Sequence, residues 1–157
     1  MTVCYTIFRK SKGEIKMIYC GYQGCGKSTY CRNHPTTTVD LDSSMFIKRE
    51  GWELAYVSIA QELSNAGKLV FISAHQAVIN HLLKSGIKFE LLLPAQNAKA
   101  WRSRLEFRYN ISPTQANMNA ILDFDKHFDD DMAFYSSLDC VKHYISARVM
   151  TDIGDFV

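Results

Sequence analysis

The residues with the clearest chemical meaning lie in one short segment near the start of the chain. Residues 21–29 read Gly-Tyr-Gln-Gly-Cys-Gly-Lys-Ser-Thr and fit the pattern G-x-x-x-x-G-K-[ST] at every fixed position. The glycines let the backbone turn so that consecutive N–H groups face an anion. A lysine beside them neutralises phosphate charge, and a serine hydroxyl binds Mg²⁺. The segment therefore predicts a loop that binds the phosphates of a nucleoside triphosphate.

Each position of this phosphate loop has a predicted role. Lys27 is expected to reach the β- and γ-phosphates, and Ser28 is expected to bind Mg²⁺. The other predicted nucleotide-binding residues are Gly21, Gly24, Cys25, Gly26 and Thr29. Cys25 is expected to carry an exposed thiol, which would be a liability in an oxidising compartment and favours the cytoplasm.

Two aspartates follow the next predicted strand. Residues 36–41 are rich in β-branched side chains, which is typical of a strand. Asp40 and Asp42 stand two residues apart at its end and are expected to share one side of the chain. In open α/β sheets, ligands bind at this carboxyl end of the strands. These carboxylates are expected to hold hydrated Mg²⁺ or to take a proton from an acceptor hydroxyl.

Two arginines form the third chemical group. Arg104 and Arg108 are four residues apart and lie on one face of a helix predicted over residues 96–109. Guanidinium groups clamp phosphoryl oxygens bidentately and stabilise charge in the transition state of phosphoryl transfer. Arg102 points elsewhere on that helix and is the weaker candidate. The acids of residues 123–131 are interpreted as a solvated helix face because they lack calcium-loop spacing.

These groups must be positioned by an alternation of strands and helices. Strands are predicted over residues 15–20, 36–41, 69–73, 89–93 and 141–145. Helices are predicted after the phosphate loop, over residues 51–66, 76–84 and 96–109, and from a Ser112 N-cap with Pro113 at the first helical position. The pattern predicts one domain over residues 1–157, a three-layer α/β/α sandwich with a five-stranded, mostly parallel sheet. Residues 1–15 are expected to be an N-terminal extension.

Composition excludes several classes of protein. The net charge of +2 over 157 residues gives no broad electrostatic case for nucleic-acid binding. Apolar runs are only strand-sized, so no membrane span is expected. The five cysteines form no C-x-x-C pair, which indicates neither a zinc site nor a disulfide framework. The sequence lacks the guanine-reading motif Asn-Lys-x-Asp, which argues against a GTPase. The third strand is followed by His75, whereas motor-type ATPases have an acid at this place, so a small kinase is favoured.

Three segments together resemble the small nucleoside and nucleotide kinases of the nucleoside monophosphate kinase superfamily, particularly compact forms common in bacteriophage genomes. They are the phosphate loop, residues 39–44, and Pro94 followed by Trp101-x-x-Arg104-x-x-x-Arg108. The resemblance implies a sheet order of 2-3-1-4-5, an acceptor-binding region over about residues 43–60, and a lid-like helical segment over about residues 95–112. It also implies ATP and Mg²⁺ as cofactors, with Arg104 and Arg108 closing over the site.

The resemblance suggests further acceptor contacts. Lys48 or Arg49 is expected to meet an acceptor phosphate. Trp52 or Tyr56 is a candidate for stacking on a base, although core packing is the preferred role for Trp52. His75 is expected to be structural.

The leading hypothesis is ATP- and Mg²⁺-dependent phosphoryl transfer to a (deoxy)nucleoside monophosphate. The Asp-x-Asp sequence also resembles shikimate, gluconate and polynucleotide 5′-hydroxyl kinases, in which an aspartate acts as base. A hydroxyl acceptor on a metabolite, a nucleoside or a nucleic-acid end or modified base therefore stays open. A non-catalytic NTP-binding module is the third alternative. The oligomeric state is not predicted.

Overall fold

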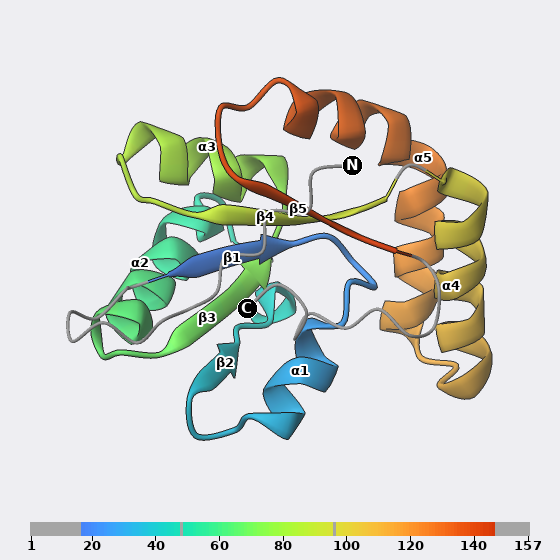
Figure 1. The fold of residues 1–157 in the computed structure, drawn as a ribbon, viewed down its shortest axis with the longest axis horizontal. Helices are drawn as coiled ribbons and strands as arrows, with labels where there is room; N and C mark the ends of the chain where they lie inside the picture. The colour runs from blue at the N-terminus through green and yellow to red at the C-terminus, as the bar shows by residue number, and fades with distance from the viewer. Residues whose placement is uncertain (1–16, 48, 96, 147–157) are drawn as a thin grey trace.

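The computed structural model describes residues 17–47, 49–95 and 97–146, and the predicted N-terminal extension lies outside these ranges. The described chain alternates strands with helices (Figure 1). Its elements are β1 (Ile18–Gly21), α1 (Lys27–Asn33), β2 (Thr38–Asp40), the 3₁₀ turn η1 (Ser43–Met45), α2 (Trp52–Asn65), β3 (Leu69–Ser73), α3 (Gln76–Lys84), β4 (Glu90–Pro94), α4 (Ala98–Ile111), α5 (Gln115–Ser136) and β5 (Lys142–Ile145).

The five strands form one sheet in the order β2-β3-β1-β4-β5. This order confirms the prediction, and every pair of neighbouring strands is parallel where a mostly parallel sheet was expected. β1 is the central strand, and its last residue Gly21 pairs with Ser73 of β3 and Leu92 of β4. Because all carboxyl ends lie at one edge, the loop that leaves β1 emerges at the middle of that edge.

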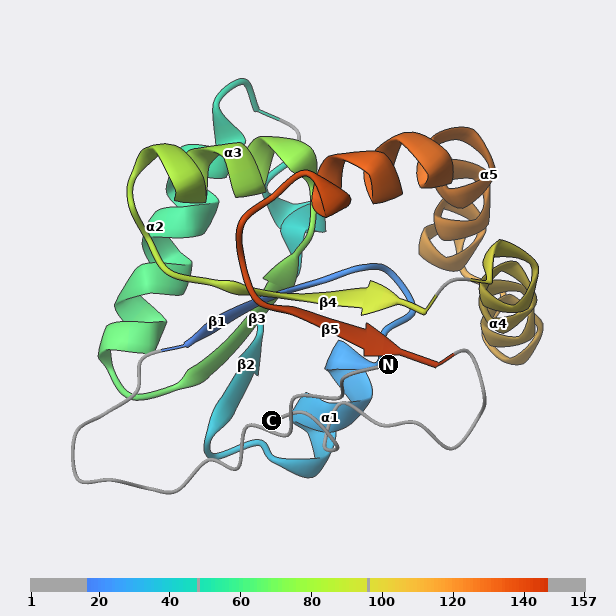
Figure 2. The same cartoon turned by 45° about the horizontal axis from the view of Figure 1, so that its top comes forward.

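Helices cover both faces of the sheet. Figure 2 shows α2, α3 and α5 along one face and α1 against the other, with α4 beside α5 at the end of the molecule. The central strands are buried on both faces and therefore consist of continuous apolar runs. The side chains with no measurable exposure include Tyr19, Val70, Phe71, Ile72, Leu91 and Leu92. The fold is thus a three-layer α/β/α sandwich.

The predicted start of α5 is wrong by two residues. α4 extends to Ile111, so Ser112 serves as the C-cap of α4, and its N–H donates to the Arg108 carbonyl. Thr114 is the N-cap of α5 instead, and its hydroxyl accepts from the Asn117 N–H at 3.1 Å. The predicted bounds of the third strand (69–73) and of α3 (76–84) are confirmed.

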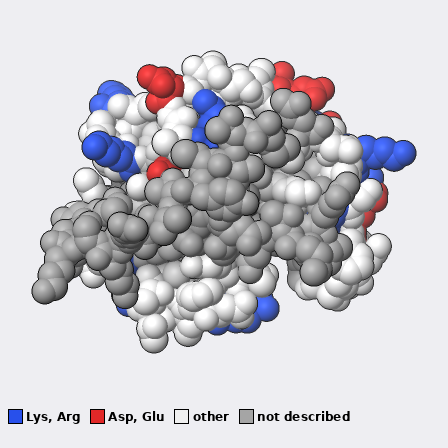
Figure 3. Space-filling model, viewed as in Figure 1, with Lys and Arg blue, Asp and Glu red and all other residues white. Residues whose placement is uncertain are grey.

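The surface seen in Figure 3 carries positive and negative side chains interspersed among uncharged ones. Among the helices that the structure describes, none is both long enough and apolar enough to cross a lipid bilayer.

Candidate functional site

The phosphate loop connects the end of β1 to the start of α1. Gly24 and Gly26 have φ angles of +82° and +98°, a left-handed conformation that glycine adopts without a steric penalty. The Tyr22 N–H donates to the Leu92 carbonyl of β4 at 2.9 Å, which ties the start of the loop to the sheet. The loop backbone therefore has the turns that the glycine pattern predicts.

Close packing is a second reason for glycine in this loop. A Cβ on Gly21 would lie 2.6 Å from the Cys25 sulfur and 2.8 Å from Lys27 Cδ. A Cβ on Gly24 would lie 2.8 Å from Leu105 Cδ2 of α4. Real Cβ atoms do not approach other atoms this closely, so larger residues at either position would displace the loop or its neighbours.

Lys27 folds back over its own loop. Its Nζ donates to the Gly21 carbonyl at 2.8 Å and lies 3.9 Å from the Cys25 sulfur. A phosphate oxygen would be a stronger partner for the ammonium group than this neutral carbonyl, because hydrogen bonds between ionised groups are stronger.

Ser28 and Asp40 are brought into direct contact. The Ser28 hydroxyl donates to Asp40 Oδ2 at 2.5 Å, and this hydrogen bond links the start of α1 to the end of β2. Mg²⁺ in nucleotide sites takes one or two protein oxygens and completes its octahedron with waters and phosphates. One hydroxyl and one carboxylate fit that requirement, so the two predicted metal ligands form a suitable pair.

Asp42 lies beyond the end of β2 and caps η1. Its Oδ1 accepts from the Ser44 N–H at 2.9 Å, and its Oδ2 accepts from the Ser44 hydroxyl at 2.8 Å. The carboxylate is exposed and keeps further lone pairs for another donor. Asp40 and Asp42 thus have different partners: one faces the phosphate loop and the other is bound to its own turn.

Tyr56 of α2 holds the ends of two strands together. Its hydroxyl donates to the Leu41 carbonyl at 2.6 Å and accepts from the Ser73 N–H at 2.8 Å. Burial raises the pKa of this phenol well above its usual range. The residue is fully buried against Phe46 and Trp52, so the expectation that Tyr56 could stack on a base is wrong. Its role is to fix the strand ends that carry Asp40 and His75.

His75 stands at the edge of the site as the N-cap residue of α3. Its Nε2 lies 3.5 Å from the Ser43 hydroxyl, and its ring meets Trp52 edge to face with 5.5 Å between centroids. Partial removal of the ring from water is the main cause that lowers its pKa, and Lys27 acts in the same direction. The ring contact with Trp52 agrees with the expected packing role of that tryptophan.

The acids of residues 123–131 are predicted to form a solvated helix face; Asp131 departs from this prediction because it is partly buried, whereas Asp123 is exposed as predicted. Asp131 accepts from Gln76 Nε2 at 2.9 Å, and partial burial raises the pKa of its carboxyl. Asp123 lies 3.4 Å from Gln23 Nε2 of the phosphate loop. The available sequence signal for Asp131 was its position at the border of the apolar stripe of α5. Asp129 and Asp130 are exposed, as expected.

The arginines of α4 are each bound to protein groups. Arg104 Nη1 donates to the Ser146 carbonyl at 3.1 Å, and Arg108 Nε donates to Asn117 Oδ1 at 2.7 Å. Arg102 points elsewhere, as predicted, and binds Asp125 through Nε and Nη2 at 2.7 and 2.9 Å. These two hydrogen bonds join the guanidinium groups of Arg104 and Arg108 to groups outside the phosphate loop.

Cys25 differs from its prediction. The side chain is only 1% exposed, so the expected exposed thiol is wrong. The reason is the turn of the loop, which directs the sulfur inward against Gly21, beneath the Lys27 side chain. The four cysteines in the described ranges, Cys20, Cys25, Cys31 and Cys140, are free thiols.

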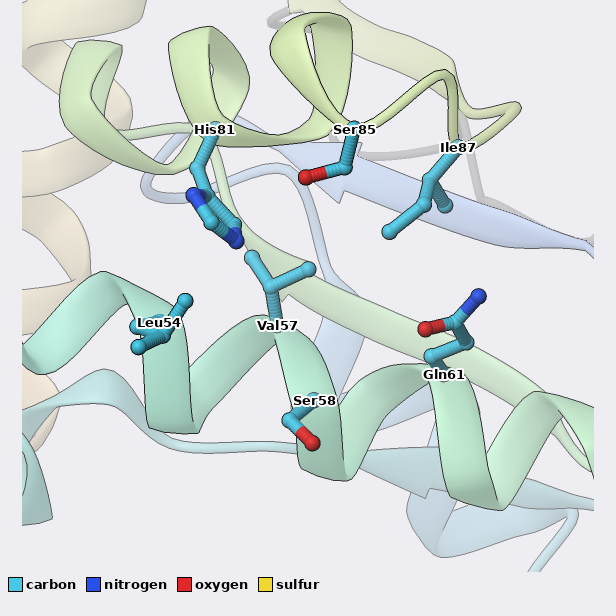
Figure 4. Close-up of a pocket in the computed structure, with 7 residues that line it drawn as sticks. All are labelled: Leu54, Val57, Ser58, Gln61, His81, Ser85 and Ile87. Atoms are coloured by element: carbon cyan, nitrogen blue, oxygen red, sulfur yellow. The ribbon is translucent and has the colours of Figure 1, made fainter.

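A separate hollow lies between α2 and α3. It has a volume of about 300 Å³ and is lined by Leu54, Val57, Ser58, Gln61, His81, Ser85 and Ile87 (Figure 4). None of these residues belongs to the phosphate loop, to the Asp40 and Asp42 pair or to the arginines of α4, although Leu54, Val57 and Ser58 fall within the acceptor-binding region predicted over about residues 43–60. The hollow is therefore separate from the phosphate loop.

Comparison of the sequence with models of known protein families and with curated proteins finds no match. Inference about function consequently depends on the residues and geometry of the phosphate loop and its neighbours.

Proposed function

We propose that this protein transfers a phosphoryl group from ATP, with Mg²⁺, to a (deoxy)nucleoside monophosphate and so forms the diphosphate. The observation that carries the proposal is the 2.5 Å hydrogen bond between Ser28 and Asp40, one residue from Lys27. A Mg²⁺–nucleotide site requires a hydroxyl and a carboxylate close to the lysine that binds the phosphates. This hydrogen bond places the two groups together, and Ser28 directly follows Lys27 in the chain. By resemblance, we also propose a cytoplasmic role in nucleotide supply, as in a phage-infected cell.

The residues of the loop have distinct roles in this proposal. Backbone N–H groups of the loop bind phosphate oxygens, and Lys27 exchanges its bond to the Gly21 carbonyl for one to the transferring group. Ser28 and Asp40 would hold the metal. Bound Mg²⁺ would neutralise charge on the β- and γ-phosphate oxygens.

Transfer forms a bond between an acceptor oxygen and the γ-phosphorus and breaks the bond from that phosphorus to the β–γ bridging oxygen. ADP is the leaving group. A nucleoside monophosphate brings an oxygen that is already anionic, so it needs cations more than a base. Arg104 and Arg108 would supply them by leaving the Ser146 carbonyl and Asn117.

A hydroxyl acceptor is the second candidate, and one observation favours it. Both arginines are engaged within the fold, whereas Asp42 is exposed and, among the described residues, accepts hydrogen bonds from its neighbour Ser44. In this case Asp42 takes the hydroxyl proton as the acceptor oxygen bonds to phosphorus. Candidate acceptors are a small metabolite, a nucleoside, and a nucleic-acid end or modified base. A binding module without transfer is the third alternative.

The first experiment measures ADP release with ATP and Mg²⁺ against nucleoside monophosphates, nucleosides, shikimate, gluconate and 5′-hydroxyl oligonucleotides. Release that depends on a monophosphate, with the matching diphosphate formed, supports the leading proposal. Release only with a hydroxyl compound supports the second candidate. A steep fall in oligonucleotide affinity with salt would identify a polymer acceptor. ATP binding with no acceptor-dependent release would support the binding module.

Lys27→Ala is the control for this assay. The substitution removes the ammonium group and should abolish transfer while the circular dichroism spectrum stays that of the wild type. Wild-type turnover by this variant would contradict the role of the loop.

A further inference from the structure

Gln23 of the phosphate loop forms hydrogen bonds to both helices of the α4–α5 hairpin. The Trp101 indole N–H of α4 donates to the Gln23 carbonyl at 3.0 Å. The Gln23 side chain in turn donates through Nε2 to the Ala120 carbonyl of α5 at 2.9 Å. Trp101 has no measurable exposure, so water does not compete for its hydrogen bond. The loop backbone is therefore held from the helical side by a buried donor.

The geometry of the peptide bond gives this contact a consequence for phosphate binding. The carbonyl of Gln23 and the N–H of Gly24 belong to one planar peptide unit, which is trans because the described residues include no cis bond. In a trans peptide the C=O and N–H point in opposite directions. When the indole fixes the Gln23 carbonyl toward α4, it also directs the Gly24 N–H away from α4.

The same peptide lies directly against α4. A Cβ on Gly24 would be 2.8 Å from Leu105 Cδ2 and 3.6 Å from Trp101 Nε1. Gly24 has a left-handed φ of +82° at this contact. Gly24 occupies a variable position of the phosphate-loop pattern, between the fixed glycines Gly21 and Gly26. Consecutive N–H groups of such a loop are donors to an anion, and the Gly24 N–H is one of them. Rotation of this peptide would point a carbonyl oxygen at the phosphates in place of an N–H.

Trp101 also contacts an arginine that was predicted to act in transfer. The guanidinium carbon of Arg104 lies 5.0 Å from the centroid of the Trp101 ring, within cation–π range. The bidentate pair of Arg102 and Asp125 joins α4 to α5 on their exposed side. One indole therefore contacts the phosphate loop through its N–H and the arginine through its ring.

We propose that Trp101 is a positioning residue for nucleotide binding. Its indole N–H sets the orientation of the Gln23–Gly24 peptide and so presents the Gly24 N–H to the phosphates, while the Gln23 side chain anchors the same peptide to α5. The proposal rests on the proposed function, because it concerns the same phosphate loop. It assigns to Trp101 a role in ATP affinity that differs from core packing.

The test uses the two tryptophans of the chain, Trp52 and Trp101. Trp52→Phe leaves Trp101 as the only indole, and Trp101→Phe leaves Trp52. Mg–ATP affinity is measured by calorimetry, and tryptophan emission is recorded during the titration. Removing one buried hydrogen bond should weaken Mg–ATP binding by about 3- to 10-fold in Trp101→Phe. Trp52→Phe should bind as the wild type does and should show an emission change on binding.

A further variant separates the hydrogen bond from packing. In the Trp52→Phe protein, 3-benzothienylalanine at position 101 keeps the shape of the indole but replaces its N–H by sulfur. This variant should reproduce the loss of affinity and raise KM for ATP without changing KM for the acceptor. If Trp101→Phe fails to fold, this variant alone tests the contribution of the indole N–H.

The outcomes distinguish the two proposals. Wild-type ATP affinity in both Trp101 variants overturns the positioning role and leaves the proposed function intact. If the wild-type protein binds Mg–ATP no better than Lys27→Ala does, and neither shows binding, the proposed function and the positioning role are both overturned. A weaker affinity in the sulfur analogue alongside normal binding by Trp52→Phe supports the positioning role.

Discussion

The Ser28 hydroxyl donates to the Asp40 carboxylate over 2.5 Å, and this contact joins two segments that are twelve residues apart in sequence. Ser28 is the second residue of α1, and Asp40 is the last residue of the edge strand β2. β2 does not pair with β1, because β3 lies between them. The hydrogen bond therefore fixes the position of Asp40 relative to the phosphate loop across the width of a strand.

Replacement of Asp40 should change the metal requirement. Asp40→Asn keeps the size of the side chain and an acceptor for Ser28, but it removes the negative charge that attracts Mg²⁺. The Mg²⁺ concentration for half-maximal ADP release should rise about tenfold or more, as expected for loss of roughly 1.4 kcal/mol of metal affinity. Asp42→Asn is the matched control and should leave the Mg²⁺ dependence unchanged. An equal shift in both variants would refute separate roles for the two aspartates.

A side chain at Gly24 should destabilise the protein more than the same change at another glycine of similar conformation. Gly24→Ala strains a left-handed residue and places a methyl group 2.8 Å from Leu105 Cδ2. Gly86→Ala is the control, because its φ is +66° and its Cβ would have nothing within 4 Å. We expect a loss of about 1–2 kcal/mol at Gly86 and a further ~1–3 kcal/mol at Gly24 from overpacking. Urea unfolding of both variants measures the difference in their free energies of unfolding. Equal losses would show that α4 shifts to accommodate the methyl group without a measurable cost.

Removal of the Tyr56 hydroxyl should loosen the carboxyl ends of β2 and β3. Tyr56→Phe leaves the buried ring in place but removes the partner of the Ser73 N–H and the Leu41 carbonyl. Leaving such groups unpaired costs about 1–3 kcal/mol, to be measured as a lower free energy of unfolding. Tyr22→Phe is the control, because the buried Tyr22 hydroxyl has no hydrogen-bond partner among the described residues. A Tyr22→Phe loss as large as that of Tyr56→Phe would argue against the bridge.

His75 should make the fold less stable as the pH falls. Its pKa is lowered in the folded protein, mainly by desolvation and also by Lys27, while Asp123 and Asp131 oppose the shift. Below its ordinary pKa of about 6.5 the unfolded chain therefore binds the proton first, and stability is lost on acidification. The raised pKa of Asp131 acts with the opposite sign, in a lower pH window. The neighbours Ser43 and Trp52 are uncharged.

The measurement compares melting temperatures at pH 7.5 and 5.5. His75→Gln should lose less stability than the wild type over this interval. His81→Gln on α3 controls for the removal of one histidine from the chain. An unchanged pH dependence in His75→Gln would contradict the lowered pKa of His75.

The alternation of strands with helices and the phosphate loop could be predicted because their determinants are local, whereas the sheet order was expected only from the resemblance to small nucleotide kinases. Glycine spacing specifies the turns of residues 21–26, and apolar runs separated by helices specify parallel strands. The pairing of Ser28 with Asp40 follows from the same topology, since both lie at the carboxyl edge. The start of α5 was wrong because two capping sequences, at Ser112 and Thr114, compete within three residues, and the length of α4 decides between them.

The rest of the site depends on contacts that no local pattern encodes. Trp101 was assigned to a helix with arginines, but its hydrogen bond to Gln23 requires α4 to lie against the loop. The inward turn of Asp131 depends on Gln76, which is 55 residues away in the chain. Cys25 is buried because the loop turns its sulfur inward, whereas the motif specifies only that this position varies. Tertiary packing determines each of these.

The central place of β1 also bears on how the protein forms during synthesis. β1 and β2 leave the ribosome first but cannot pair, since β3 separates them. The loop gains its last supports only when Trp101 and Ala120 have been made, about three quarters of the way along the chain. A nascent chain that ends before α4 thus carries the complete nucleotide motif without the helices that hold it. Contacts between segments that are far apart in sequence form slowly. Newly made chains should therefore acquire ATP affinity late, after α4 and α5 have packed against the loop.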